Sequence, residues 1–588
     1  MANWKENLNT QLYESKRDVY YILRVFSVII SVIAFALTMT RYGFYLSEDE
    51  VSLIHTAWII LLLCFLFAYL FRILYSFHRR DFLRRTWFEG SLMLTNLAYF
   101  ILLLLGFNLI DKGLESYVAL FIIFLSVFEF VKISPRINLI KIQPTTIFIA
   151  SFLLLITVGT CILMLPTVTT VEGSMPFIDA LFTAVSASCV TGLIVVDTGT
   201  YFTLKGHILL LILFQLGGLS IISFATFFST LFPKSVGIKH QSIIKNIYSS
   251  ESLVSAQKLF KQIVLITIFI EALITAAIFF TWGPEVEFKG TGQKIFYSLF
   301  HAVAAFCNSG FSLYTDGLYT EFIRDAYILH IVIALAIIFG GIGFPVIQDV
   351  LSIKKMRERL KYPWKDWTTG SKVAIYTSIA LLIFGTATVW LIESNNTLKE
   401  MNLMQAFIAS FFQSVTARSA GFNTIDTSAL QVQTHLILIF LMFVGASPAS
   451  TGGGIKTTTF LLIVVSSLAT IKESTHIEIG KRTIPNELIS KAFSLFTFAV
   501  AFNFIGILVL SFTEQGASLM TVIFEQISAF TTTGLSAGLT PELTPPGKLM
   551  IIISMFSGRV GILTVALALS RKVSTTSYRY PDTHIMIG

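Results

Sequence analysis

The chain has 588 residues, of which 54% are hydrophobic and only 13% are charged, and its mean hydropathy is +0.76. This composition excludes a soluble globular protein and predicts a polytopic membrane protein. The formal charge of +8 does not indicate nucleic-acid binding, because the basic residues are scattered along short loops. The four cysteines lie in apolar segments without metal-ligand spacing, so we expect neither disulfides nor a zinc site.

Twelve apolar runs are long enough to cross a bilayer. They lie at about 19–40, 52–74, 90–110, 117–133, 145–166, 206–231, 260–281, 327–348, 371–392, 434–469, 491–512 and 547–570. Loops on one side carry clusters of Lys and Arg, for example within 79–85 and 354–365, whereas the opposite loops are rich in acids. By the positive-inside rule, both termini are expected to be cytoplasmic.

A short apolar segment occurs four times between these runs and ends each time in a glycine that Leu or Phe follows. The glycines are Gly192, Gly310, Gly421 and Gly534, and Phe182, Phe300, Phe411 and Phe524 stand ten positions before them. The copies recur about every 110–120 residues, so each belongs to its own internal repeat. Because each copy is too short to span a bilayer, we interpret it as a re-entrant half-helix followed by an extended turn.

Four such turns that meet at one axis have the chemistry of a cation pore. The C-terminal end of a half-helix is negative, carbonyl oxygens of the turn can replace the water around an ion, and glycine permits the positive φ that such turns need. The ordinary alternative is that small-residue turns only join helices. The predicted ion-binding residues are Val190, Thr191, Gly192, Leu193, Asn308, Ser309, Gly310, Phe311, Ser419, Ala420, Gly421, Phe422, Thr532, Thr533, Gly534 and Leu535.

Over residues 145–588 these segments resemble the Trk/Ktr/HKT superfamily of potassium transporters, most closely a bacterial Ktr/Trk-type pore-forming membrane subunit. In that family, glycine in all four filters accompanies potassium preference, so the resemblance implies potassium uptake across the bacterial inner membrane. It also implies a homodimer, with a contact through the tail at 578–588, and a cytosolic nucleotide-binding regulatory ring. The chain itself has no phosphate-binding glycine loop, so we expect no cofactor besides the transported K⁺.

The predicted fold is an all-α polytopic membrane protein with four helix–re-entrant pore loop–helix repeats around a central pore, preceded by four extra N-terminal transmembrane helices. The predicted domains are 1–140 for the extra helices, then repeats at 145–256, 257–369, 370–489 and 490–588. The extra helices do not form a voltage sensor, because the fourth run lacks Arg or Lys at three-residue spacing. Packing or dimer contact is the remaining interpretation.

The third repeat is interrupted where its second helix should continue. A proline followed by three glycines does not continue a stable helix, so this segment predicts a flexible loop that obstructs the pore, as the gating loop does in the resembling family. The alternative is a static kink against another helix. The predicted gate residues are Ser447, Pro448, Ala449, Ser450, Thr451, Gly452, Gly453, Gly454, Lys456 and Arg559.

Charges inside apolar segments are costly and usually face a cavity or a partner. Arg559 matches a family position near the pore axis, where it would oppose a cation and brace the loop; Arg418 matches a structural pore-helix arginine. Lys456 either reaches the interface or caps the broken helix. For Glu271 an ion pair and a vestibule role both stay open.

The remaining acids near the repeated segments have ordinary explanations. Asp179 and Glu525 are expected to cap half-helices. Asp197, Asp316 and Asp426 follow the turns, where they either add negative potential at the outer mouth or are solvated loop charges.

Transport is expected to be passive or coupled to sodium or protons. A sodium-selective or weakly selective cation channel is the nearest alternative function. A membrane enzyme is a remote alternative, because the nine histidines are dispersed and form no cluster with acids or cysteines at one membrane face.

Overall fold

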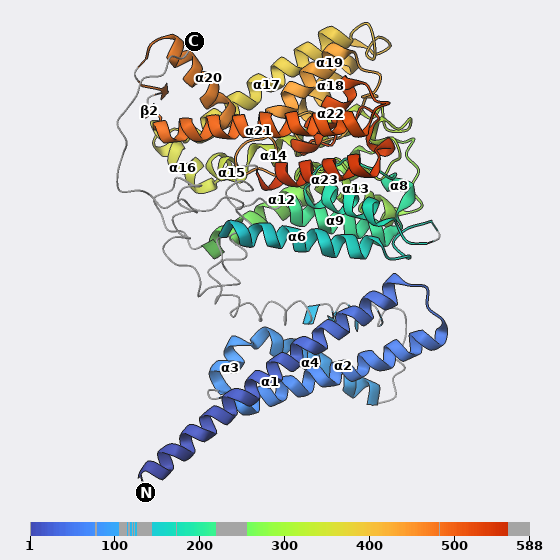
Figure 1. Ribbon diagram of the computed structural model, residues 1–588, viewed down its shortest axis with the longest axis vertical. Coiled ribbons are helices and arrows are strands. Elements are labelled where there is room, and N and C mark those ends of the chain that lie inside the picture. The colour runs from blue at the N-terminus through green and yellow to red at the C-terminus, as the bar shows by residue number, and fades with distance from the viewer. Residues whose placement is uncertain are drawn as a thin grey trace.

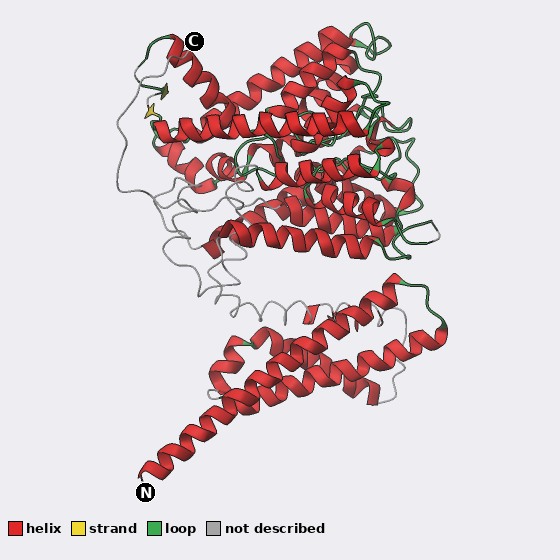
Figure 2. Ribbon diagram, in the orientation of Figure 1, coloured by secondary structure: helices red, strands yellow, loops and turns green. Residues whose placement is uncertain are grey.

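The computed structural model describes residues 2–104, 144–218 and 256–561 except 77, 78, 172, 475 and 481, together with a few residues between 115 and 125. The protein is built of helices in these ranges, and a single pair of two-residue antiparallel strands joins them, β1 (Glu478–Ile479) and β2 (Arg482–Thr483) (Figure 2). Most of the fourth predicted N-terminal span and the predicted dimer-contact tail lie outside the described residues.

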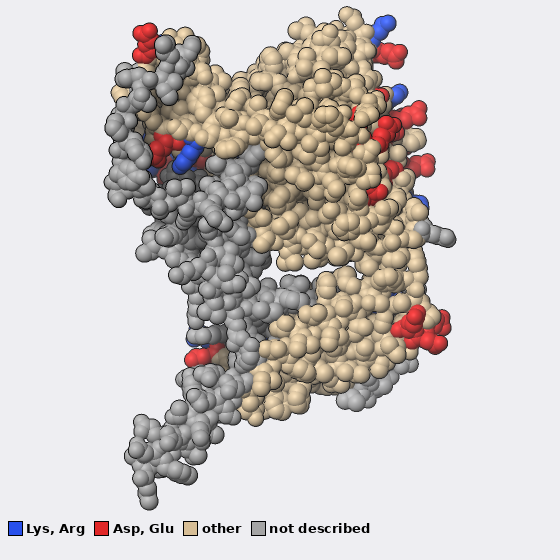
Figure 3. Space-filling model, viewed as in Figure 1, with Lys and Arg blue, Asp and Glu red and all other residues tan. Residues whose placement is uncertain are grey.

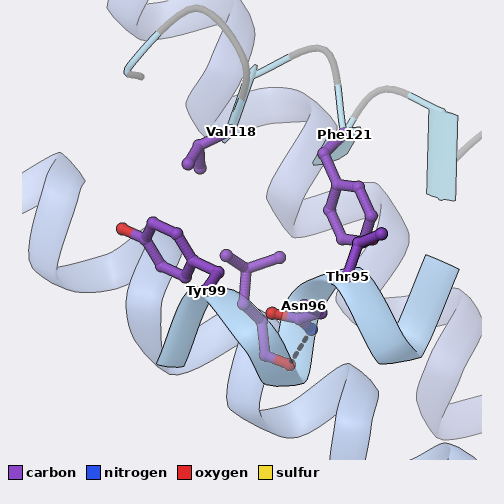
Figure 4. A pocket seen from close by; sticks show the side chains of 6 residues that line it. Thr95, Asn96, Tyr99, Val118 and Phe121 are labelled. Atoms are coloured by element: carbon purple, nitrogen blue, oxygen red, sulfur yellow. Dashed lines mark hydrogen bonds between the residues drawn. The ribbon is translucent and has the colours of Figure 1, made fainter. Parts of the chain in front are cut away.

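The N-terminal helices form a group of their own, which lies below the main body in the view of Figure 1. It contains α1 (Ala2–Gly43), α2 (Glu48–Tyr75), α3 (Arg79–Arg85) and α4 (Trp87–Leu104). Polar contacts between helices accompany the apolar packing: Arg72 pairs with Glu89 at 2.6 Å, and Asn96 Nδ2 donates to the carbonyl oxygen of Leu62 at 3.1 Å beside a small pocket (Figure 4). Buried polar groups are stable only when paired in this way.

This N-terminal group touches the main body at the end of α1. The Thr167 amide donates to the carbonyl oxygen of Gly43 at 3.2 Å, and Lys205 Nζ donates to that of Tyr42 at 2.9 Å. The contact therefore joins the C-terminal end of α1 to a residue that follows α6 (Pro144–Leu163) and to the first turn of α9 (Leu204–Gly218).

The main body repeats one succession four times: a first helix, a shorter helix, an irregular turn and a second helix. The first two sets are α6 (Pro144–Leu163), α7 (Phe177–Ser188), α8 (Thr198–Tyr201) and α9 (Leu204–Gly218), then α12 (Ala256–Thr281), α13 (Thr291–Cys307), η2 (Gly317–Tyr319), α14 (Tyr327–Ile342), α15 (Phe344–Leu351) and α16 (Ile353–Lys361). The last two sets are α17 (Thr369–Glu393), α18 (Leu403–Thr416), α19 (Val432–Phe443) and α20 (Thr457–Ile471), then α21 (Asn486–Thr513), α22 (Leu519–Phe530), η3 (Thr540–Glu542) and α23 (Pro545–Val560).

Five helices within the described residues are long and apolar enough to cross a membrane. They are Val25–Gly43, Glu48–Tyr75, Lys261–Thr281, Thr369–Glu393 and Asn486–Thr513, and the pair α14–α15, bent by 102°, adds a sixth if it is one span. The predicted spans at 145–166, 206–231 and 434–469 correspond to shorter apolar helices: α9 reaches the limit of the described residues, and residues 444–456 separate α19 from α20. The protein is a multi-pass membrane protein.

The two ends of the main body differ in charge. Acidic side chains gather along the edge on which α8 lies (Figure 3), whereas the basic helix α16 lies at the opposite end (Figure 1). The short helices α7, α13, α18 and α22 lie between these ends, and each packs against the first helix of its set.

Candidate ion pathway

Each of the four short helices runs into an irregular turn with the same backbone pattern. In these glycine turns (residues 190–193, 308–311, 419–422 and 532–535), the first and third residues both have positive φ. The first residues are Val190 (57°), Asn308 (61°), Ser419 (71°) and Thr532 (49°), and the third are Gly192 (92°), Gly310 (69°), Gly421 (80°) and Gly534 (89°). A left-handed conformation at a non-glycine residue costs about 1–3 kcal/mol, so the surrounding structure must hold it.

The four glycine turns lie side by side in a closed ring. A Cβ built on Gly192 would lie 3.0 Å from the Cα of Gly310, and one on Gly310 would lie 3.1 Å from that of Gly421. The same holds from Gly421 to Gly534 at 3.1 Å and from Gly534 back to Gly192 at 3.0 Å. Neighbouring turns therefore pack backbone to backbone, and any side chain at these glycines would collide with the next turn.

Within the described residues, the ring contains main-chain oxygens without a hydrogen-bond partner. The second residue of each turn is completely buried, namely Thr191, Ser309, Ala420 and Thr533. Among the hydrogen bonds of the described residues, none ends on the carbonyl oxygens of these four residues. Buried carbonyl groups are normally paired, so four unpaired oxygens in one ring indicate that something other than the protein satisfies them.

Hydroxyl groups on the short helices fix the turns. Ser186 Oγ accepts from the Gly192 amide at 3.1 Å and donates to the Leu193 carbonyl oxygen at 2.7 Å. Ser528 Oγ accepts from the Gly534 amide at 3.1 Å, and Thr416 Oγ1 donates to the Phe422 carbonyl oxygen at 2.6 Å. These contacts help to hold the backbone against its strain.

Glycines near the ends of the second helices of the first, second and fourth sets lie against the last turns of the short helices. A Cβ on Gly217 would lie 2.7 Å from the carbonyl carbon of Ser188, one on Gly340 3.0 Å from that of Phe306, and one on Gly558 2.7 Å from that of Phe530. In the third set, the corresponding Gly445 faces Gly453 of its own chain segment instead, at 3.2 Å.

The α19–α20 loop (residues 444–456) is irregular where the sequence predicts an interruption. Its backbone is tied to the end of α14: the Ser447 amide donates to Gly341 O at 3.0 Å and the Thr451 amide to Gly340 O at 3.3 Å. The Gly453 amide donates to Ser419 Oγ at 2.8 Å, directly beside the third glycine turn. The loop is therefore wedged between a second helix and the ring.

Three cations donate to carbonyl oxygens of this loop, and two of them, Arg559 and Lys456, are predicted gate residues. Arg559 is 7% exposed and donates to the oxygens of Thr451 and Gly217, bridging the loop to α9. Lys456 Nζ donates to Gly452 O at 2.6 Å. Arg418 donates to Ser378 Oγ at 3.0 Å and to Gly445 O at 3.4 Å.

The acids have more specific partners than sequence reasoning predicted. Glu525 lies in the middle of α22, not at its start, so the capping interpretation is wrong: it accepts from the Ala537 amide at 3.0 Å and from Thr540 Oγ1 at 2.7 Å, and so holds the chain after the fourth turn. Asp179, in the first turn of α7, pairs with Lys548 at 2.6 Å. Glu271 accepts from Gln215 Nε2 at 3.1 Å.

The acids after the turns stay within the outer loops. Asp197 caps α8 and accepts from Thr315 Oγ1 at 3.0 Å, which links the first and second turns. Asp426 accepts from the Ser428 amide at 2.9 Å, and the main-chain oxygen of Asp316 accepts from Asn423 at 3.2 Å. Within the described residues, no group of three or more His, Cys, Asp or Glu side chains is arranged to hold a metal ion.

Sequence reasoning did not find the left-handed residue at the start of each turn. Only Asn308 carried a signal, because asparagine tolerates this conformation, whereas Val190 and Thr532 are β-branched and normally avoid it. The sequence shows glycine pairs such as Gly217-Gly218 and Gly340-Gly341, but their contacts with the short helices were not predicted.

A ring of main-chain oxygens at the ends of four short helices, inside an apolar helical protein, defines a class of membrane protein that passes cations. Residues 114–579 match the TrkH family, described as cation transport protein, which is most of the chain. The protein therefore belongs to the TrkH family of cation transport proteins and is not an enzyme.

Three curated relatives match this chain over nearly the whole of their own length. The Ktr system potassium uptake protein B of Bacillus subtilis is 36% identical over 454 residues, which is 77% of this chain and 98% of that protein. The protein of the same name from Vibrio alginolyticus is 37% identical over 451 residues, 75% of this chain and 94% of its own. The potassium/sodium uptake protein NtpJ of Enterococcus hirae is 35% identical over 454 residues, 76% and 98% respectively.

The fold is also similar to that of a solved structure. The potassium transporter TrkH from Vibrio parahaemolyticus superposes with a TM-score of 0.61 over 82% of this chain and 96% of that chain, at 17% sequence identity. This similarity supports the mostly helical architecture.

Proposed function

We propose that the protein takes up potassium across the cell membrane through the ring of glycine turns. The observation that carries the proposal is the set of four unpaired carbonyl oxygens, of Thr191, Ser309, Ala420 and Thr533, in one buried ring. Oxygens in such a ring replace the hydration shell of a cation without the cost of an unmet hydrogen bond. The names of the Bacillus subtilis and Vibrio alginolyticus relatives support potassium as the ion.

The α19–α20 loop is the gate of this pathway. It contacts the third glycine turn from one side, and Arg559 places a positive charge on the loop, which repels a passing cation. Residues 447–454 move aside to open the pathway, and Lys456 and Arg559 hold them when it is closed. A static kink would need no such charged clamp.

The resemblance to the family supports a proposal for the partners. The protein acts as a homodimer with one pathway in each subunit, in which residues 145–256, 257–369, 370–489 and 490–588 are the four repeats and residues 1–140 are an addition. A cytosolic nucleotide-binding ring regulates it, in line with the "Ktr system" names of the relatives. Both termini and α16 face the cytoplasm, and the acidic edge faces outward.

A pathway shared by potassium and sodium is the second candidate. It is favoured by the name of the Enterococcus hirae relative, a potassium/sodium uptake protein. Glycine in all four turns supports the potassium-selective candidate, because each turn keeps the same pattern of positive φ at its first and third residues.

The test is ⁸⁶Rb⁺ uptake into vesicles that contain the purified protein, with K⁺ or Na⁺ as competitor. Gly192→Ser adds a side chain that collides with Ser309 and Gly310, so discrimination between K⁺ and Na⁺ is expected to fall by about tenfold, which corresponds to about 1.4 kcal/mol. Gly480→Ser is the matched control, because Gly480 also has positive φ (65°) but has no atom within 4 Å of a built Cβ. Unchanged discrimination in Gly192→Ser, or equal competition by both ions in the unmodified protein, contradicts the proposal.

A further inference from the structure

Helix α16 carries two exposed rows of different chemistry. Met356 and Leu360 are 49% and 80% exposed, and Trp364, just after the helix, is 77% exposed. Arg357 and Lys361 are exposed as well, and neither has an acidic partner within the described part of the chain. Residues four apart lie on one helix face, so the apolar row and the basic row run side by side.

The third face of α16 is occupied by ion pairs with α15. Asp349 of α15 accepts from Lys355 at 3.1 Å and from Arg359 at 2.7 Å, and its other oxygen accepts from the Thr368 amide at 2.9 Å, just before α17. These contacts fix α15, α16 and the start of α17 to one another. The exposed rows are therefore held in a defined direction.

We propose that α16 binds the headgroups of anionic phospholipids at the cytoplasmic surface of the membrane. Arg357 and Lys361 contact the phosphates, and Met356, Leu360 and Trp364 enter the boundary between headgroups and acyl chains. Basic residues beside exposed apolar residues, with a tryptophan close by, are typical of helices that lie in this layer. A protein partner is the less favoured occupant. Helix α17, which is long and apolar enough to span the membrane, begins shortly after α16, so α16 lies close to the membrane surface.

The lipid site is connected to the gate, and this step rests on the proposed function. Helix α15 begins at Phe344, whose amide donates to the carbonyl oxygen of Ala449 in the α19–α20 loop at 3.3 Å. The 102° bend between α14 and α15 lies at Gly343, where φ is 93° and a built Cβ would lie 3.4 Å from the Ser450 amide. Lipid that holds α16 in this position keeps α15 against the obstructing loop and so lowers the basal flux.

The test compares purified protein, without any cytosolic partner, in vesicles of neutral phosphatidylcholine and in vesicles that also contain phosphatidylglycerol. Arg357→Glu combined with Lys361→Glu reverses the basic row. The control is Lys289→Glu combined with Lys399→Glu, which makes the same charge change at two exposed lysines far from α16 in the chain. Native mass spectrometry measures the phosphatidylglycerol retained on each protein, and ⁸⁶Rb⁺ uptake measures the flux.

The α16 variant is expected to bind phosphatidylglycerol on the order of tenfold more weakly, as the loss of two basic residues implies. Its flux is expected to be equal in both vesicles, whereas the unmodified and control proteins are several-fold slower in the anionic ones. Equal lipid retention in all three proteins overturns the lipid site. Weaker retention with unchanged flux supports the site and overturns its link to the loop, and retention can be read even if no protein passes Rb⁺.

If α16 binds a protein instead of lipid, the same variant gives a different result. If the α16 variant keeps its phosphatidylglycerol but loses its response to an added cytosolic regulatory subunit, α16 is a protein-docking surface and the proposal is wrong.

Discussion

The third set differs from the other three sets in what the corresponding glycine touches. Gly217, Gly340 and Gly558 each lie against the main chain at the end of a short helix, whereas Gly445 lies against Gly453 of the α19–α20 loop. In the first, second and fourth sets the contact is between two helices that both support the ring. In the third set both glycines belong to the irregular α19–α20 loop, so the same residue type forms a rigid contact in one place and a displaceable contact in the other.

The largest expected effect comes from adding a methyl group to a rigid joint. In Gly558→Ala the new Cβ overlaps the carbonyl group of Phe530, and neither backbone can move without disturbing the fourth turn. Overpacking of this kind costs about 1–3 kcal/mol or more, so we expect a lower yield of folded protein and flux reduced by more than about tenfold.

Gly445→Ala sharpens the comparison, because its Cβ meets the loop instead of a helix. We expect it to fold normally and to conduct faster. Thermal unfolding and ⁸⁶Rb⁺ uptake per folded protein measure both variants, with Gly516→Ala, which has open space around it, as the control. If both variants lose folding equally, the distinction between the two kinds of contact is wrong.

Shortening the loop between residues 447 and 454 is the next largest change. It removes the donors of Ser447 and Thr451 that tie the loop to α14, together with the segment that obstructs the pathway. Loss of two backbone hydrogen bonds of about 1 kcal/mol each shifts an open–closed equilibrium by roughly tenfold or more. Flux is therefore expected to rise by about that factor, and a variant that folds but conducts no faster contradicts the gate.

Several of these features could be predicted from the sequence and others could not. The register of the four glycines and the break before Gly452 follow from local chemistry, since glycine and proline disfavour a continuous helix. The left-handed conformation of Val190 could not be predicted, because it opposes local preference and depends on tertiary burial, where Val190 lies beside Gly217 of α9. The role of Glu525 was missed for a related reason: its partners, Ala537 and Thr540, are brought to it only by the fold.

Arg559→Gln tests the clamp between the loop and the rigid part. The glutamine keeps a polar amide but removes the charge and the double contact with Thr451 and Gly217. A hydrogen bond to a charged group contributes about 1.5–3 kcal/mol, part of which the amide retains, so we expect flux to rise several-fold. Arg418→Gln is the control, since two of its three hydrogen bonds go to Ser378 of α17 and only one, at 3.4 Å, reaches Gly445 at the start of the loop; it is expected to lower thermal stability with little change in flux. Faster flux in both variants would show that charge alone, and not the clamp, limits the flux.

The smallest effect is expected from Ser419→Ala, which removes one hydroxyl at the point where the loop meets the third turn. Ser419 Oγ accepts from the Gly453 amide at 2.8 Å and donates to Thr531 O and Thr532 O at 3.1 Å. Its loss costs about 1 kcal/mol, so flux is expected to rise by less than about tenfold while K⁺ over Na⁺ discrimination stays the same. Ser309→Ala is the matched change in the second turn, where the hydroxyl donates to Ala304 O of its own short helix at 3.2 Å. Among the described residues, no hydrogen bond joins that hydroxyl to the α19–α20 loop, so Ser309→Ala should leave the flux unchanged. An equal rise in both variants would mean that the third turn is not special.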